Sequence, residues 1–127
     1  MGADQIAEMR PIITEVLEGA RRGEAWCGTF EVSGDSARWL QVTATELNVA
    51  YPSTQPPPEL LAQVAHAGAR SLTLREWKPR TFATFDVASD SSAAQLGQIA
   101  DALFQTVLGC DDEYHVDASL VRLDDSN

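Results

Sequence analysis

Apolar and polar positions follow a helical period over Asp90–Gly109, which is the clearest pattern in the chain. Its apolar residues recur at steps of three or four and therefore share one face: Leu96, Ile99, Leu103 and Val107. Ser92 followed by Gln95 fits a capping box that predicts the start, with Asp90 or Ser91 as competing caps. The glycine at the end of the range predicts the stop.

The opposite side of this helix is polar, and its broad apolar face needs a surface on which to pack. The residues on this polar side, which we expect to face solvent, are Gln95, Gln98, Asp101 and Gln105. We expect this helix to cover a sheet as a structural layer. Binding is then expected on the sheet or on a shorter second helix.

Residues 4–22 also predict a helix, which ends in two arginines and a glycine. Its apolar stripe consists of Ile6, Met9, Ile13, Val16, Leu17 and Ala20. Pro11 lies inside it, and proline lacks the N–H donor and clashes with the preceding turn. The segment is therefore either kinked or begins at Pro11, and we favour one helix with a disturbed first part.

The apolar period changes to two from Ala25, which predicts strands with one buried face each. In the first strand, Trp26, Phe30 and Val32 share that face. Three short segments joined by tight turns predict an antiparallel meander: 25–32, 39–44 and 47–51.

Residues 52–58 form a loop with three consecutive prolines. The loop is either a rigid connector or a PxxP-type ligand, and we favour the connector because Pro58 suits the first turn of a helix. That helix is expected over Pro58–Ala67. Segments 71–77 and 81–87 return to period two and predict a hairpin that leads into the last helix.

The order of elements is thus helix, three strands, helix, two strands, helix. We predict an α+β fold, α-β-β-β-α-β-β-α, with one antiparallel sheet of about five strands and helices packed on it. The 127 residues make a single domain, 1–127. Residues 110–127 make an acidic C-terminal tail, in which 119–123 is a short strand or a helix extension and 124–127 fray.

Charge narrows the classes of partner. The chain has 9 Lys and Arg against 19 Asp and Glu, which gives a net charge of −10. Nucleic acid and anionic membranes need basic clusters and are excluded as partners. A basic protein or peptide is better matched, but acidity more often only gives solubility, and we favour that interpretation. No apolar run is long enough to span a membrane, and Met1–Arg10 does not match a signal peptide, so we expect a cytoplasmic protein.

Candidate chemistry is sparse. Cys27 and Cys110 lie far apart without CxxC spacing, so two free thiols are expected. His66 is expected to be structural. His115 lies in the acidic segment Asp111–Asp117, whose oxygens could hold a divalent cation, but the spacing differs from an EF-hand and we favour a solvated loop. We therefore expect a protein that is not an enzyme and has no cofactor or metal.

The order of elements resembles that of the type III secretion chaperone-like superfamily, including the YbjN-related and TY-Chap groups of bacterial proteins. The resemblance spans Asp4 to about Gly109 and rests on element patterns, while Pro11 and the tail Cys110–Asn127 depart from it. The matching parts are the helix ending at Arg21-Arg22, strands around Trp26–Phe30, Trp39–Val42 and Leu47–Tyr51, the helix Pro58–Ala67 ending in Ala67-Gly68-Ala69, the hairpin through Trp77, and the helix Ala93–Leu108.

This resemblance implies a small, acidic, cytoplasmic homodimer that binds an unfolded segment of a partner protein along apolar grooves. A peptide-binding chaperone or adaptor of this kind would leave an apolar patch exposed after its sheet is covered. The candidate protein-binding residues are Trp39, Tyr51, Leu61, Trp77 and Phe82. For each aromatic residue, the alternative is membership of the core.

Two other functions stay open. An acidic immunity protein, similar to an antitoxin, would block a partner toxin through charge complementarity, and a toxin gene beside its own would indicate it. A metal-binding protein or an enzyme would use His115 and the neighbouring acids, and metal analysis would test it.

Overall fold

The computed structural model describes residues 3–61, 72–88, 90–111 and 113–123 of the chain. The described elements are, in order, α1 (Ala3–Arg21), β1 (Trp26–Val32), β2 (Asp35–Val42), β3 (Glu46–Ala50), α2 (Pro57–Leu61), β4 (Thr73–Lys78), β5 (Phe82–Asp86), α3 (Ala93–Thr106) and β6 (Val116–Arg122). This order confirms the predicted α+β class and adds one strand after α3.

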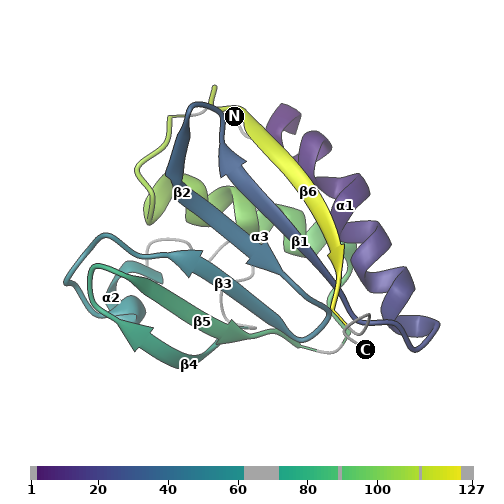
Figure 1. The fold of residues 1–127 in the computed structure, drawn as a ribbon. Helices are drawn as coiled ribbons and strands as arrows, with labels where there is room; N and C mark the ends of the chain where they lie inside the picture. Colours follow the sequence, from purple (N-terminus) through teal and green to yellow (C-terminus); the bar gives the residue numbers. More distant parts are fainter. Residues whose placement is uncertain (1–2, 62–71, 89, 112, 124–127) are drawn as a thin grey trace.

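The strands form one antiparallel sheet in the order β4-β5-β3-β2-β1-β6 (Figure 1). The meander β1-β2-β3 lies at its centre, and the predicted hairpin β4-β5 extends it beyond β3. The C-terminal tail supplies the sixth strand, β6, which pairs with β1 without interruption from Trp26–Arg122 to Val32–Val116. Within the tail, residues 119–123 therefore fall mostly in a strand and not in a helix extension.

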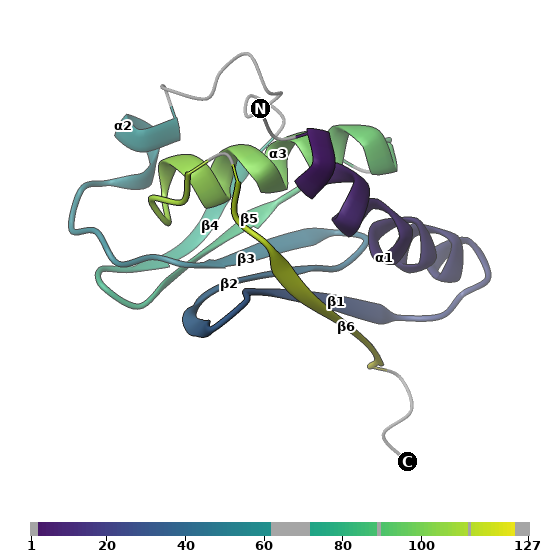
Figure 2. The same cartoon turned by 90° about the horizontal axis from the view of Figure 1, so that it is seen from above.

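The described helices cover one face of this sheet (Figure 2). Helix α1 packs against α3 and lies over β1 and β6. The approach of α1 to the sheet is close at Gly19, where a Cβ atom would lie 2.2 Å from Cδ1 of Trp26. The opposite face carries none of the described helices, and we call it the uncovered face.

The core fills the space between the helices and the sheet. Alternate residues of the central strands point into it, and each is at most 1% exposed: Phe30, Leu40, Val42, Leu47, Val49, Ala83 and Phe85. Met9 and Ile13 of α1 and Leu96 and Leu103 of α3 meet them from the helix layer. The apolar stripes read from the sequence are therefore the buried stripes.

Helix α1 is one helix with Pro11 inside it, as the apolar stripe predicts. Because proline has no N–H, the carbonyl of Ala7 receives no helical hydrogen bond. Ala7 and Pro11 are both exposed, so water can satisfy this carbonyl. The helix tolerates Pro11 for that reason.

Helix α3 begins at the predicted capping box. Ser92 Oγ accepts from the Gln95 amide at 3.1 Å, and Gln95 Oε1 accepts from the Ser92 amide at 2.8 Å. Past the helix, Gly109 has a φ of 68°, and the Cys110 amide donates to the Phe104 carbonyl at 3.0 Å. A left-handed residue of this kind favours glycine.

One position on α3 departs from the sequence expectation. Asp101 is only 9% exposed, so its assignment to the solvent-facing side is wrong. The cause is Tyr114, which follows α3 in the chain and donates its hydroxyl to Asp101. The helical period assigns faces within α3, but it carries no information about a later segment that folds over one of them.

The second helix, α2, ends at Leu61 in the described residues. The remainder of the expected helix up to Ala67, with His66, lies outside them. Among the helices that the structure does describe, none combines the length and the apolar character needed to cross a membrane.

Candidate functional site

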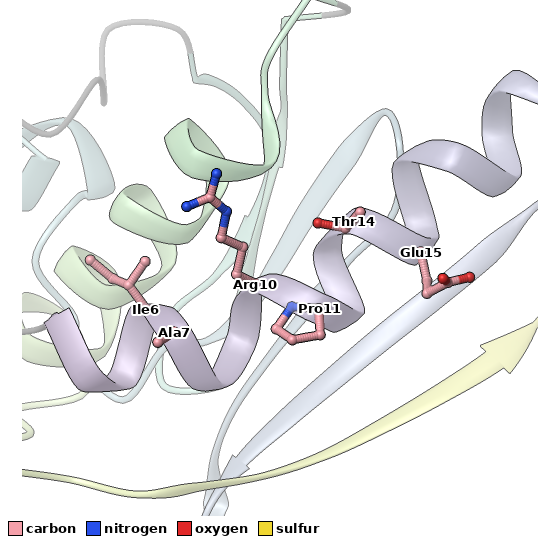
Figure 3. A pocket seen from close by; sticks show the side chains of 6 residues that line it. All are labelled: Ile6, Ala7, Arg10, Pro11, Thr14 and Glu15. Atoms are coloured by element: carbon pink, nitrogen blue, oxygen red, sulfur yellow. The ribbon is translucent and has the colours of Figure 1, made fainter.

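A groove of about 550 Å³ runs along the first half of α1 (Figure 3). One side of the helix lines it through Ile6, Ala7, Arg10, Pro11, Thr14 and Glu15. Arg10 and Glu15 bring one charge of each sign, with Pro11 between them, and Ile6 and Ala7 add apolar surface on the other side of Arg10 (Figure 3). The groove suits an apolar side chain better than a polar small molecule.

The uncovered face carries hydrogen-bonded polar side chains across four strands. Gln41 Nε2 donates to Thr29 Oγ1 at 3.4 Å, and Asn48 Nδ2 donates to Gln41 Oε1 at 3.3 Å. Thr84 Oγ1 in turn donates to Asn48 Oδ1 at 2.9 Å. We call these four residues the polar ladder, and a depression of about 280 Å³ beside it is lined by Cys27, Gln41, Thr43, Glu46, Asn48, Thr84 and Leu123.

An apolar row lies beside the polar ladder on the same face. Phe82 of β5 pairs with Ala50 of β3. Leu40 of β2 pairs with Val49, and the same antiparallel register places Trp39, one residue earlier, opposite Ala50. Ala50 is 5% exposed, whereas Trp39 and Phe82 are half-buried. The structure thus brings two of the predicted protein-binding residues into one row, Trp39–Ala50–Phe82, which we call the aromatic row.

The other predicted binding residues lie elsewhere. Tyr51 is 1% exposed, and its hydroxyl donates to the Gln55 carbonyl. Trp77 packs edge-on against Tyr51, with ring centroids 5.9 Å apart, on the covered side of β4. Tyr51 is therefore a core residue, which is the second of the two alternatives. The side chain of Leu61 lies outside the described part of the structure.

A polar depression of about 380 Å³ lies between the β1–β2 turn and the segment after α3, and Asp111, Glu113 and His115 of the acidic segment line it. Asp111 Oδ1 accepts from the Glu113 amide at 2.9 Å, so this carboxylate stabilises a turn. Arg38 Nε lies 3.3 Å from Asp35 and brings a positive charge to the same depression. Among the described residues, which leave out Asp112, no group of three or more potential metal ligands occurs.

The two thiols lie in environments that do not activate them. Burial raises the pKa of the Cys27 thiol and also that of the Cys110 thiol. Both thiols are therefore neutral near pH 7 and are poor nucleophiles. His115 is exposed, and its Nδ1 lies 3.4 Å from Glu8 Oε2, so this contact joins α1 to the residue before β6.

A buried polar cluster escaped the sequence reasoning. The Tyr114 hydroxyl donates to Asp101 at 2.7 Å, and Gln105 Nε2 lies 3.1 Å and 3.0 Å from the two Asp101 oxygens. Gln5 Nε2 donates to the Tyr114 carbonyl at 2.8 Å. Desolvation by burial and the hydrogen bond to Asp101 raise the pKa of Tyr114. The cluster joins α1, α3 and the segment before β6, and no local spacing could predict it.

Comparisons with protein-family models, with curated proteins and with solved structures found no match. The surfaces of this chain are therefore what indicate its function. Of those surfaces, the uncovered face has the largest aromatic side chains beside ordered polar groups.

Proposed function

We propose that this chain is a non-enzymatic protein-binding module that acts in the cytoplasm. It is a chaperone or adaptor similar to the type III secretion chaperone-like superfamily and holds an extended segment of a partner protein. The observation that carries this proposal is the aromatic row Trp39–Ala50–Phe82 on the uncovered face.

Aromatic side chains of this kind are effective anchors for a partner. Each buries roughly 150–250 Å² when fully covered, and apolar burial contributes about 25 cal/mol per Å². Trp39 packs in part against the core. Covering the parts of Trp39 and Phe82 that stay exposed stabilises a complex, since such residues dominate the binding energy of many interfaces. The neighbouring polar ladder fixes the surrounding side chains and offers amide and hydroxyl groups to a partner backbone.

A peptide library displayed on phage tests this proposal with the purified chain as bait. We expect selected peptides to bind the natural chain and to lose at least about tenfold in affinity, or 1.4 kcal/mol, in Trp39→Ala and in Phe82→Ala. Leu74→Ala is the matched control, because Leu74 is 37% exposed but points to the covered side of β4. A library that yields no binder, or binders that tolerate both aromatic substitutions, would contradict the proposal.

We also propose that the module forms a homodimer, as the resemblance implies. Sedimentation equilibrium would give twice the chain mass of 13.8 kDa. A single 13.8 kDa species over the accessible concentration range would refute the dimer.

A further inference from the structure

The two edges of the sheet differ in how they are protected against pairing with another chain. Edge strand β4 has a bulge between Leu74 and Glu76, and Pro79 follows its last residue, Lys78. Bulges, prolines and lysines are devices that prevent pairing at an edge. Edge strand β6 has no bulge, proline or lysine, and its charged residues are Asp117 and Arg122 near its two ends. Its seven pairs with β1 show no register shift. The β6 edge is therefore suited to accept a further strand.

The hydrogen bonds of β1 and β6 show which backbone groups face the free edge. The Leu123 amide donates to the Ala25 carbonyl at 2.7 Å, and the Ser33 amide donates to the His115 carbonyl at 2.8 Å. Odd-numbered residues of β6 consequently direct their backbone groups toward β1, because hydrogen-bonded pairs alternate along an antiparallel ladder. The groups of Val116, Ala118 and Leu120 point outward. In the described part of the chain, β6 pairs with β1 alone.

The uncovered face carries two acidic residues at one end of this edge, whereas the exposed Val121 lies toward the other end. Asp117 of β6 lies directly opposite Glu31 of β1, and Glu31 lies opposite Trp39 of β2. Directly opposed like charges are destabilising in a sheet. The row from the β6 edge to the aromatic row is therefore Asp117, Glu31, Trp39, and a cation beside Asp117 would relieve the repulsion.

The helix layer is acidic beside the same edge. Figure 1 shows α1 extending past β6 on the outer side of the sheet. Asp4, Glu8 and Glu15 are exposed, and their spacings of four and seven place them on one side of α1. The contact between Glu8 and His115 shows that this side faces the start of β6. A strand added to β6 would thus have carboxylates on both of its faces.

We propose that the β6 edge binds an extended, basic segment of a partner protein as an added antiparallel or parallel strand. This inference rests on the proposed function and specifies the chemistry of the partner. The outward groups of Val116, Ala118 and Leu120 supply the backbone hydrogen bonds, and lysine or arginine side chains of the segment meet Asp117 and Glu31 on one face and Glu8 on the other. A second copy of this chain is disfavoured as the occupant by its net charge of −10.

The first experiment measures binding and amide exchange with two synthetic peptides on the full chain. One peptide alternates lysine and valine, and the other alternates glutamate and valine. We expect the lysine peptide alone to bind and to slow hydrogen exchange at the Ala118 and Leu120 amides. The Ser119 and Val121 amides are protected before addition and should stay so, since they face β1. Equal binding of both peptides, or unchanged exchange at Ala118 and Leu120, would overturn the proposal.

Substitutions provide the second experiment. Asp117→Lys should weaken the lysine peptide at least about tenfold. Glu76→Lys on the opposite edge strand changes the net charge equally, and we expect less than about threefold weakening. Ala118→Pro removes one outward donor at an edge position where proline is tolerated, and it should abolish the exchange protection. If Asp117→Lys and Glu76→Lys weakened binding equally, net charge alone would explain the binding, and the proposed site would be refuted.

The two proposals fail in different ways. If library peptides need Trp39 and Phe82 but the lysine peptide leaves the β6 amides unchanged, the binding module stands and the edge site fails. If no library peptide binds while the lysine peptide protects Ala118 and Leu120, the edge site stands and the aromatic row fails. If Ala118 and Leu120 are already protected in the free chain, and Ala118→Pro converts a dimer to a monomer, a second copy occupies the edge and the inference is wrong.

Discussion

The Tyr114 hydroxyl donates a 2.7 Å hydrogen bond to Oδ1 of Asp101 inside the protein. Tyr114 is 6% exposed and Asp101 is 9% exposed, so both groups are shielded from water. The Tyr114 ring also packs on Phe104, with centroids 5.1 Å apart. This side chain fixes the chain between α3 and β6, and the position of the edge strand follows from it.

Removal of the Tyr114 hydroxyl should therefore destabilise the fold. We expect Tyr114→Phe to lower the free energy of unfolding by about 1–3 kcal/mol, because the buried Asp101 Oδ1 loses one of its two donors. Urea unfolding followed by circular dichroism measures the change. Tyr51→Phe is a control, since its hydroxyl reaches the carbonyl of Gln55, which is partly exposed. An unfolding midpoint equal to that of the natural chain would show that the bond contributes nothing.

The same hydrogen bond predicts a loss of stability at alkaline pH. Burial and Asp101 raise the pKa of Tyr114 in the folded state above the ordinary value of about 10. The stabilisation is complete below that ordinary value and declines as the pH rises toward the folded-state pKa, because the unfolded chain releases the proton first. Unfolding titrations from pH 8 to pH 11, a range set about the ordinary tyrosine value, should show a smaller decline in Tyr114→Phe than in the natural chain. Burial also raises the pKa of Tyr51, so Tyr51 accounts for part of the decline in stability that remains in Tyr114→Phe.

A close contact between α1 and β1 leaves no room for an alanine side chain at Gly19. Alanine favours a helix over glycine by about 1 kcal/mol, but its Cβ would lie 2.2 Å from Cδ1 of Trp26. We expect Gly19→Ala to destabilise the fold by about 1–3 kcal/mol, as overpacking does. Gly97→Ala in α3 is the matched control, since its Cβ would lie 3.1 Å from Ile6 Cγ2, a contact that a shift of a few tenths of an ångström relieves. Thermal unfolding of the two variants side by side would decide, and equal midpoints would contradict the contact.

The sequence predicts best those elements whose buried face and end signals are encoded within one continuous segment. The stripe Leu96–Val107 and the capping box at Ser92 follow from spacing alone, and both are in the structure. Strand β6 was harder to recognise, because an edge strand buries little and Val116–Arg122 has alanine and serine at its centre. Its register against β1 depends on pairing between residues far apart in the chain, such as Val32 and Val116, which no local pattern encodes.

The candidate site was predictable only in part. The sequence identifies Trp39 and Phe82 as large apolar side chains, and the sheet order places both beside Ala50. Tyr51 has the same apolar character but lies on the covered side, because residue type does not reveal which face the helices occupy. The opposed acids Asp117 and Glu31 belong to segments far apart in the chain, so their repulsion is visible only in the sheet register.

The polar ladder should stabilise the sheet through its central members more than through its ends. Asn48 donates to Gln41 and accepts from Thr84, so Asn48→Ala removes two hydrogen bonds. We expect a loss of about 1–3 kcal/mol, from roughly 1 kcal/mol for each bond. Thr29→Val is the control, because Thr29 accepts a single 3.4 Å bond at the end of the ladder and keeps its shape. If urea unfolding shows equal losses for both variants, the ladder does not act as a connected row.

The two thiols should differ in reactivity, and we expect Cys27 to react faster than the more buried Cys110. Cys27 is half-buried on the uncovered face, whereas Cys110 is 8% exposed beside Arg38. Because desolvation by burial raises the pKa of both thiols, a disulfide reagent should react slowly at pH 7 and faster as the pH rises past about 8.5, the ordinary cysteine value. We expect one thiol to react first in the folded chain, and Cys27→Ser to remove that phase while Cys110→Ser leaves it. Reaction of Cys110 at the faster rate would contradict its burial after α3.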